Sequence, residues 1–192
     1  MQRLFFALWP DSLWCERLLS AAKPLLNGAL GLALANVDLH VTLSFLGAVE
    51  AEQVARLRER AAAIEASAFE LLFDAFEYWP RARVLAATCA AVPPAAWELG
   101  RLLHAAALGL GLHPDLKPLR PHITLLRARA ADDARIEAAR RPSLALRFEA
   151  RQFYLAQSHE LVAHTGAAPQ MHRYARLGCW PLRVANQSGP GG

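Results

Sequence analysis

Hydrophobic and polar residues follow two distinct periods along the chain, and these periods predict a mixture of helices and strands. The segment 50–66 places Val54, Leu57 and Ala61 three or four residues apart with charged residues between them, which is typical of an amphipathic helix. Shorter runs rich in β-branched and aromatic residues, such as Leu39–Leu46, are typical of strands.

The predicted elements alternate between strand and helix without a strict strand–helix–strand repeat, which favours an α+β fold. We expect strands at Arg3–Trp9, Leu39–Leu46, Phe69–Tyr78, Arg83–Ala90, His122–Leu126, Leu144–Ala156 and Met171–Leu182. We expect helices at 12–23, 50–66, 95–108 and 132–140, with turn and cap residues at their ends. The segment 27–36 has no clear period.

The composition indicates one globular domain. Of the 192 residues, 54% are hydrophobic and 20% are charged, which leaves ample material for a buried core. We expect residues 1–183 to form this domain, and the Gly-, Ser- and Pro-rich residues 184–192 to be a disordered tail. No apolar run approaches the roughly 20 residues that a membrane span needs.

The net charge and the cysteine content bear on the partners and the cellular location that we expect for the protein. The net charge of +4 is compatible with a polyanionic partner, but a mild excess of this kind does not establish one. Cys15, Cys89 and Cys179 show no Cys-x-x-Cys spacing, so we expect neither a disulfide framework nor a zinc site, and a reducing, cytoplasmic location. We expect the protein to be a monomer.

A short motif occurs twice. The sequence His40-Val-Thr-Leu43 recurs as His122-Ile-Thr-Leu125. The chain holds only four threonines and seven histidines, so the number of His-x-Thr triplets expected by chance is well below one. Both copies lie in strand-like surroundings in comparable halves of the chain, and we interpret the repeat as the product of a half-domain duplication.

The spacing of the motif has a geometric meaning. Successive side chains of a strand point to opposite faces, so His40 and Thr42 share one face, and His122 and Thr124 do likewise. If a pseudo-two-fold axis relates the two halves, the four side chains converge on one groove. Two histidines in opposite protonation states can perform complementary proton transfers, and threonine hydroxyls can hold phosphate oxygens. The sequence offers no carboxylate cluster for a metal ion, so we expect chemistry without a metal or a cofactor.

The residues around both motifs resemble a known family. The segments His40-Val-Thr-Leu-Ser-Phe-Leu-Gly47 and Arg120-Pro-His-Ile-Thr-Leu-Leu-Arg127 are similar to the paired His-x-Thr-x motifs of the two-histidine phosphoesterases. Within that superfamily the chain resembles the RNA 2′,3′-cyclic phosphodiesterases, also called 2′-5′ RNA ligases. The similarity extends to residues 3–11 and 153–158. It departs from the family at Asp38, where asparagine is usual, and at 32–37, which lack a tryptophan often found there.

The resemblance implies a fold and an activity. The fold would be bilobal, with two pseudo-symmetric lobes whose antiparallel sheets line a central cleft and whose helices lie outside. His40 would be the proton donor and His122 the proton acceptor in the hydrolysis of a terminal 2′,3′-cyclic phosphate on RNA to a 2′-phosphate. A weak, reversible 2′-5′ RNA ligation is implied as well.

Three further residues are candidates for substrate binding. Arg127 matches an arginine that the family uses near the phosphate, and Phe45, which likewise stands five residues after its histidine, could stack on a base or ribose. Arg120 is a third candidate, for phosphate contact. Strict alternation places Phe45 and Arg127 on the face opposite the histidines, so each strand must end or bulge if they are to reach the groove.

Other functions remain open at this point. The chain could belong to another branch of the superfamily, acting on a small cyclic nucleotide, an ADP-ribose cyclic phosphate or a 2′-5′ oligoadenylate. It could also be a non-catalytic module that binds RNA ends, although arginine or lysine would serve a pure binder better than two histidines. We expect the other histidines to have structural roles and the five tryptophans to lie mostly in the core or between the lobes: His104, His113, His159, His164 and His172; Trp9, Trp14, Trp79, Trp97 and Trp180.

Overall fold

The computed structural model describes residues 1–115, 117–139, 141–159 and 173–184. Its strands are β1 (Gln2–Leu8), β2 (Leu32–Ala33), β3 (Val41–Val49), β4 (Phe69–Phe73), β5 (Ala75–Trp79), β6 (Val84–Thr88), β7 (His122–Arg127), β8 (Leu146–Ala150), β9 (Gln152–Ser158) and β10 (Tyr174–Pro181). Its α-helices are α1 (Ser12–Leu26), α2 (Ala51–Ala62), α3 (Pro94–Leu108) and α4 (Asp133–Ala138). The expected tail at 184–192 lies outside the described residues except for Val184, as do Arg140 and Met171, where we expected a helix to end and a strand to begin.

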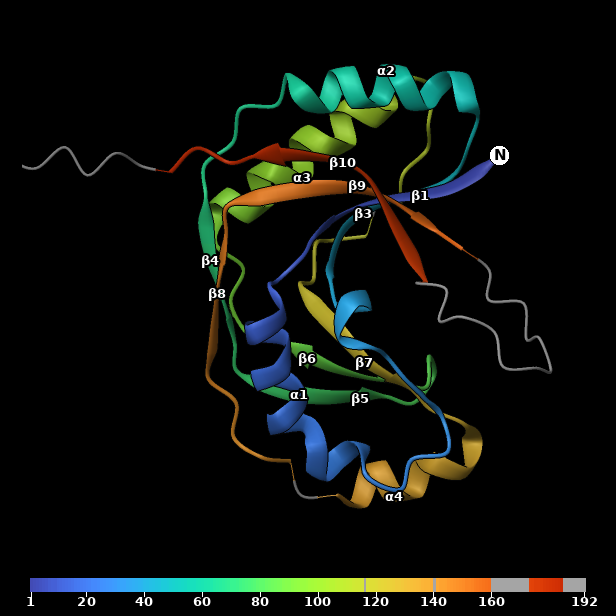
Figure 1. Ribbon diagram of the computed structural model, residues 1–192, viewed down its shortest axis with the longest axis vertical. Coiled ribbons are helices and arrows are strands. Elements are labelled where there is room, and N and C mark those ends of the chain that lie inside the picture. Colours follow the sequence, from blue (N-terminus) through green and yellow to red (C-terminus); the bar gives the residue numbers. More distant parts are fainter. Residues whose placement is uncertain (116, 140, 160–172, 185–192) are drawn as a thin grey trace, which may run out of the picture.

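The main sheet has the order β10-β9-β1-β3-β7-β6-β5, with β2 paired to β7, and all its pairs are antiparallel. β3 and β7 meet at the pair Val41–Ile123, which joins the two halves of the sheet. In Figure 1 these halves form an upper lobe, beside α2 and α3, and a lower lobe, beside α1 and α4. Each lobe contains strands from both halves of the sequence. The chain passes from β1 in the upper lobe to α1 beside the lower lobe, and later returns to the upper lobe.

Local sequence signals explain where the helices begin. The Asp11 carboxylate accepts a hydrogen bond from the Trp14 backbone N–H at 2.8 Å and caps α1. The Glu50 N–H donates to the Gln53 side chain at 3.2 Å, which forms half of a capping box before α2. α3 starts with Pro94, whose missing N–H costs nothing in a first turn.

Two expected long strands are each divided in two, so those predictions were wrong in extent. The segment 69–78 breaks at Asp74 into β4 and β5, and 144–156 breaks at Arg151 into β8 and β9. β4 and β8 pair with each other in a separate two-stranded sheet, which runs along one edge of the molecule from one lobe to the other (Figure 1). The breaks therefore lie where the chain leaves the main sheet for this connecting ribbon, and hydrophobic alternation alone does not reveal them.

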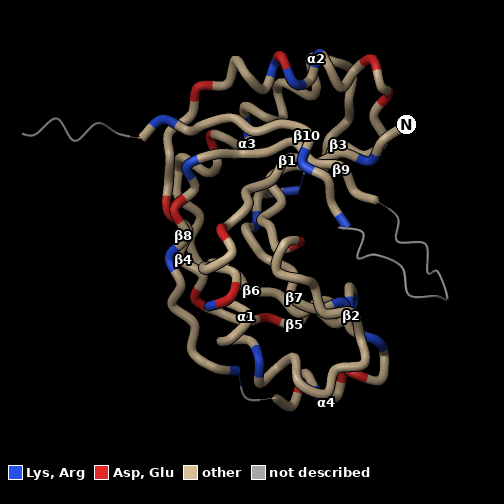
Figure 2. Tube along the Cα trace, in the orientation of Figure 1, with Lys and Arg blue, Asp and Glu red and all other residues tan. Residues whose placement is uncertain are grey.

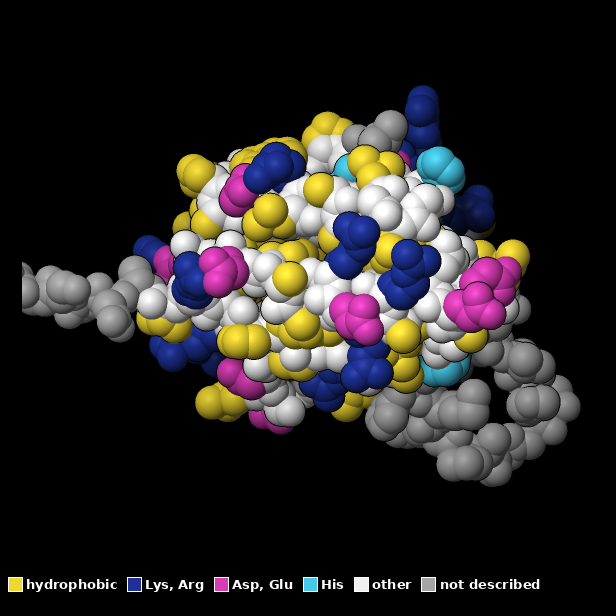
Figure 3. Space-filling view, turned by 90° about the horizontal axis from the view of Figure 1, so that it is seen from above, with side chains coloured by type: hydrophobic (Ala, Val, Ile, Leu, Met, Phe, Trp, Pro, Cys, Tyr) yellow, Lys and Arg dark blue, Asp and Glu magenta, His cyan; other side chains and the backbone are white. Residues whose placement is uncertain are grey.

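The hydrophobic core is continuous through both lobes, and Asp132 is a charged side chain buried among the described residues. Phe6, Leu57, Phe73 and Ile123 belong to one cluster of buried side chains. Figure 2 shows basic and acidic residues interspersed along α2, α4 and the β4–β8 ribbon. The face seen in Figure 3 carries positively and negatively charged side chains among hydrophobic ones. Among the described residues, no helix is long and apolar enough to span a membrane.

Candidate active site

The two His-x-Thr motifs lie on neighbouring strands and are related by their pairing. The residues at their centres, Val41 and Ile123, are paired and fully buried. Side chains on either side of a paired residue point to the opposite face of the sheet. His40, Thr42, His122 and Thr124, all half-buried, therefore share one face, as the spacing predicts.

Each histidine is held in the same way by the backbone. The Nδ1 atom of His40 lies 2.7 Å from the carbonyl oxygen of Asp38, and Nδ1 of His122 lies 2.8 Å from that of Arg120. A carbonyl can only accept, so Nδ1 carries the hydrogen in both rings. Nε2 is then the nitrogen left for proton transfer. Since Asp38 contributes its backbone carbonyl here, the replacement of asparagine by aspartate leaves this contact unchanged.

A β-bulge occurs at the same position in both motifs. The pairing of β3 with β1 skips Leu43, and the pairing of β7 with β6 skips Leu125. Each skipped residue is the third after its histidine. The extra residue reverses the alternation of side chains, so the residues that follow point to the face opposite the one that strict alternation predicts. Phe45 and Arg127 are consequently exposed, and the six-residue burial pattern from His40 to Phe45 is identical to that from His122 to Arg127.

The bulges bring both of these residues toward the histidines. Phe45 is 53% exposed, and its ring centroid lies 5.7 Å from that of Phe5, which is itself 5.0 Å from the His40 ring. The charge of Arg127 lowers the pKa of both His40 and His122. Part of the face forms a pocket of about 310 Å³, lined by Thr42, Phe45, Trp79, Arg120 and His122 among others.

The chain resembles known phosphoesterases in both sequence and structure. Residues 15–86 match the family model described as LigT like Phosphoesterase. The RNA 2′,3′-cyclic phosphodiesterase of Escherichia coli (strain K12) is 33% identical over 126 residues, which span 66% of this chain and 72% of that protein. The chain belongs to the LigT-like phosphoesterase family.

Solved structures extend this family likeness to nearly the whole chain. E. coli LigT complexed with 3′-AMP superposes with a TM-score of 0.77 at 29% identity and covers 94% of this chain and 98% of that one. E. coli LigT complexed with NADP+ gives a TM-score of 0.76 at 31% identity over 94% and 97%. The protein TT0787 of Thermus thermophilus, at 24% identity and a TM-score of 0.74 over 95% and 99%, shares the fold. The predicted family and α+β fold are thus confirmed.

In this LigT-like site, His40 lies in an aromatic enclosure. Its ring stacks on Trp9 at 4.8 Å between centroids and meets the edge of Tyr174 at 4.6 Å. Burial lowers the pKa of His40 to about 4, against the opposing effect of the hydrogen bond to Asp38. The nearby charges of His122 and Arg127 lower that pKa further.

His122 has a more polar setting. Its ring lies 4.8 Å from the Trp79 ring, and the Arg120 guanidinium stacks over the same indole at 4.7 Å. Glu77 accepts hydrogen bonds from Trp79 Nε1 at 2.8 Å and Arg120 at 2.5 Å. Burial lowers the pKa of His122, Arg120 and Arg127 lower it further, and the Glu77 carboxylate acts in the opposite direction.

Several of these neighbours were not singled out from the sequence: Phe5, Trp9, Glu77, Trp79 and Tyr174. One signal could have found two of them, because Trp9 and Trp79 each precede a proline at the end of a strand and each contacts one motif histidine. Trp180-Pro181 shares the dipeptide, yet its indole packs on the core residue Phe153 at 5.4 Å. Among the described residues, no three His, Cys, Asp or Glu side chains are grouped as a metal site requires.

Proposed function

We propose that this protein hydrolyses the 2′,3′-cyclic phosphate at the end of an RNA to a 2′-phosphate, with His40 as proton donor and His122 as proton acceptor and without a metal ion. The observation that carries the proposal is the matched pair of imidazoles on one face of the sheet. Each has Nδ1 tied to a backbone carbonyl, so each presents Nε2 to the same side. The E. coli relative named RNA 2′,3′-cyclic phosphodiesterase supports the choice of substrate.

The reaction follows from these two nitrogens. His122 Nε2 removes a proton from water as the water oxygen attacks phosphorus. The bond from phosphorus to the ribose O3′ breaks, and His40 Nε2 gives its proton to O3′. The products are a 2′-phosphate and a free 3′-hydroxyl, and exchange with solvent returns the proton from His122 to His40.

Three side chains would stabilise the charge that develops on the phosphate. Thr42 and Thr124 flank the histidines on the same face and offer hydroxyl donors to the equatorial oxygens. Arg127, which the β7 bulge turns toward that face, adds a positive charge. Arg120 is held by Glu77 at 2.5 Å over Trp79, so we assign it to the wall of the pocket. We assign Phe45, which is 53% exposed, to stacking on the terminal base or ribose.

The same chemistry includes a ligation. If the 5′-hydroxyl of a second RNA replaces water as the nucleophile, His122 removes its proton and the product is a 2′-5′ linkage. Water is present at far higher concentration than RNA ends, so hydrolysis should dominate.

The test is turnover of an oligoribonucleotide that bears a 2′,3′-cyclic phosphate, in the presence of EDTA. We expect a 2′-phosphate product, and a loss of about 10²–10⁴-fold in kcat for His40→Ala and for His122→Ala. His113→Ala, which removes an exposed histidine after α3, is the matched control and should keep full activity. Retention of more than about a hundredth of the rate in either motif variant, formation of a 3′-phosphate, or inactivation by EDTA would each contradict the proposal.

A further inference from the structure

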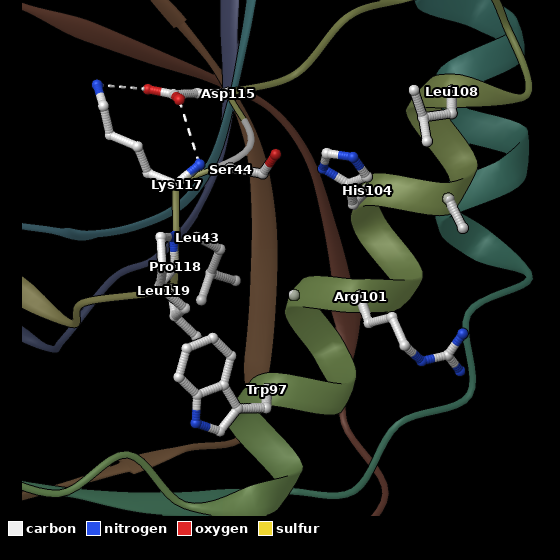
Figure 4. Close-up of a pocket in the computed structure, with 12 residues that line it drawn as sticks. Leu43, Ser44, Trp97, Arg101, His104, Leu108, Asp115, Lys117, Pro118 and Leu119 are labelled. Atoms are coloured by element: carbon white, nitrogen blue, oxygen red, sulfur yellow. Dashed lines mark hydrogen bonds and ion pairs between the residues drawn. The ribbon is translucent and has the colours of Figure 1, made fainter.

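A second pocket, of about 380 Å³, lies between α3 and the segment that leads to β7. Figure 4 shows Trp97, Arg101, His104 and Leu108 of α3 along one side and residues 117–119 along the other, with Ser44 between them. We call this space the α3 groove. Its lining includes neither His122 nor Trp79, both of which line the catalytic pocket.

We propose that the α3 groove binds the nucleotide that precedes the RNA end, so that the preferred substrate is an oligonucleotide rather than a mononucleotide. This inference rests on the proposed function and names a substrate class for it. It would decide between RNA ends and small cyclic nucleotides, which the sequence leaves open.

Continuity with the catalytic pocket is the first argument. Leu43, Ser44, Asp115 and 117–119 line both spaces. The bulge in β3 makes this possible, because Thr42 and Phe45 face the catalytic side whereas Leu43 and Ser44 turn toward α3. A chain whose last nucleotide lies against His122 and Phe45 therefore needs only to cross residues 117–119 to enter the α3 groove.

Exposed aromatic surface is the second argument. We expected Trp97 to lie in the core or between the lobes, but it is 44% exposed at the edge of the α3 groove, and Leu108 at the other end is 49% exposed. α3 packs inward through Ala96 and Leu99, and the Trp97 indole extends from the helix toward Leu119 at the edge of the α3 groove (Figure 4). A flat indole at the edge of a groove is the usual platform for an unpaired base, whatever its identity.

Polar groups suited to a nucleotide complete the α3 groove. Lys117 and Arg101 line it, Lys117 in an ion pair with Asp115 at 3.0 Å and Arg101 in one with Glu98 at 2.6 Å. His104 offers a ring nitrogen. Ser44 is only 8% exposed, and its Oγ has no hydrogen-bond partner among the described residues. An unpaired buried hydroxyl is costly, and a polar ligand group at the bottom of the α3 groove would satisfy it.

The experiment compares two substrates in one protein. We would measure kcat/KM for a tetranucleotide with a terminal 2′,3′-cyclic phosphate and for the mononucleoside 2′,3′-cyclic phosphate of the same base. We expect a ratio of about tenfold or more in favour of the tetranucleotide. Trp97→Ala should reduce that ratio by about fivefold or more, the loss of one stacked base, and Trp97→Phe should restore most of it. Leu13→Ala, at another exposed apolar residue, on α1, should leave the ratio unchanged.

A binding measurement keeps the test independent of turnover. Fluorescence anisotropy of a labelled tetranucleotide ending in a 3′-phosphate should show weaker binding to Trp97→Ala than to the wild type. If neither cyclic substrate is hydrolysed, the proposed function fails and this binding arm still decides the α3 groove. Equal ratios in wild type and Trp97→Ala, together with equal affinities, would overturn the inference.

Discussion

Binding of substrate should move the pH optimum of this enzyme upward. In the free protein, burial holds the pKa of His40 at about 4, so at pH 7 only about one molecule in a thousand carries the proton that a donor needs. The pKa of His122 is lowered as well. In the proposed mechanism, a further negative charge near His40 must therefore raise its pKa so that it carries the proton, and a bound phosphate is the natural source of that charge.

The size of the effect follows from Coulomb's law. A single negative charge about 4 Å from the His40 ring, at an effective dielectric constant of about 20, contributes about 4 kcal/mol. This is about a thousandfold in proton affinity, enough to raise the pKa of His40 from about 4 to about 7. The bound enzyme would then hold a substantial fraction of protonated His40 at neutral pH.

Steady-state kinetics from pH 4 to 9 on a 2′,3′-cyclic substrate separate the two states. The profile of kcat/KM reports the free enzyme and kcat reports the complex. Both should be bell-shaped, with limbs that belong to the histidine pair rather than to either ring. We expect kcat/KM to peak below pH 6.5, and kcat to peak about one pH unit or more higher. Superimposable profiles would refute the reasoning, as would an NMR titration in which His40 still titrates below pH 5 with the 2′-phosphate product bound.

Three further predictions concern charge, stability and packing. Arg127→Gln should lower kcat/KM by about 100-fold through loss of a charge at the phosphate and move the kcat/KM optimum upward, whereas Arg147→Gln, at an exposed position of β8, should do neither. Between pH 6.5 and about pH 4, His40 is protonated in the unfolded chain but not in the folded one. The free energy of unfolding, measured with urea, should therefore fall by up to about 3 kcal/mol over this range, and the fall should be smaller in His40→Asn. Gly31→Ala should lower Tm and kcat/KM because its Cβ would collide with the Arg127 carbonyl, whereas Gly100→Ala, which meets only Leu119 Cδ2 at 3.8 Å, should not lower Tm.

The repeated motif is the part of the site that the sequence predicts best. Alternation along a strand is a local property, and it places His40 with Thr42 and His122 with Thr124 correctly. The same rule places Phe45 on the wrong face, because it assumes an unbroken ladder. A bulge depends on how two strands pair, and the sequence of β3 alone contains no signal that its pairing with β1 skips Leu43.

The rest of the site depends on the order of strands in space. Tyr174 reaches His40 from β10, and Glu77 and Trp79 reach the surroundings of His122 from β5. These strands lie far from the motifs along the chain, and nothing in their hydrophobic pattern predicts which neighbour each will have. The division of 69–78 between two sheets has the same origin.

The two copies of the motif are nearly identical as far as the bulge, so the difference between a donor and an acceptor must come from their surroundings. The rings of Trp9, Phe5 and Tyr174 pack around His40, and burial disfavours its charged form, which makes its imidazolium a strong acid once formed. Glu77 lies near His122 and favours its protonated form, which helps it accept a proton from water. In the proposed mechanism, the lowered pKa of His40 agrees with the role of donor because the substrate phosphate supplies the charge that loads the proton. Under the proposed mechanism, the free protein therefore holds His40 in the wrong protonation state at neutral pH, and an anionic substrate phosphate bound near His40 would supply the missing charge.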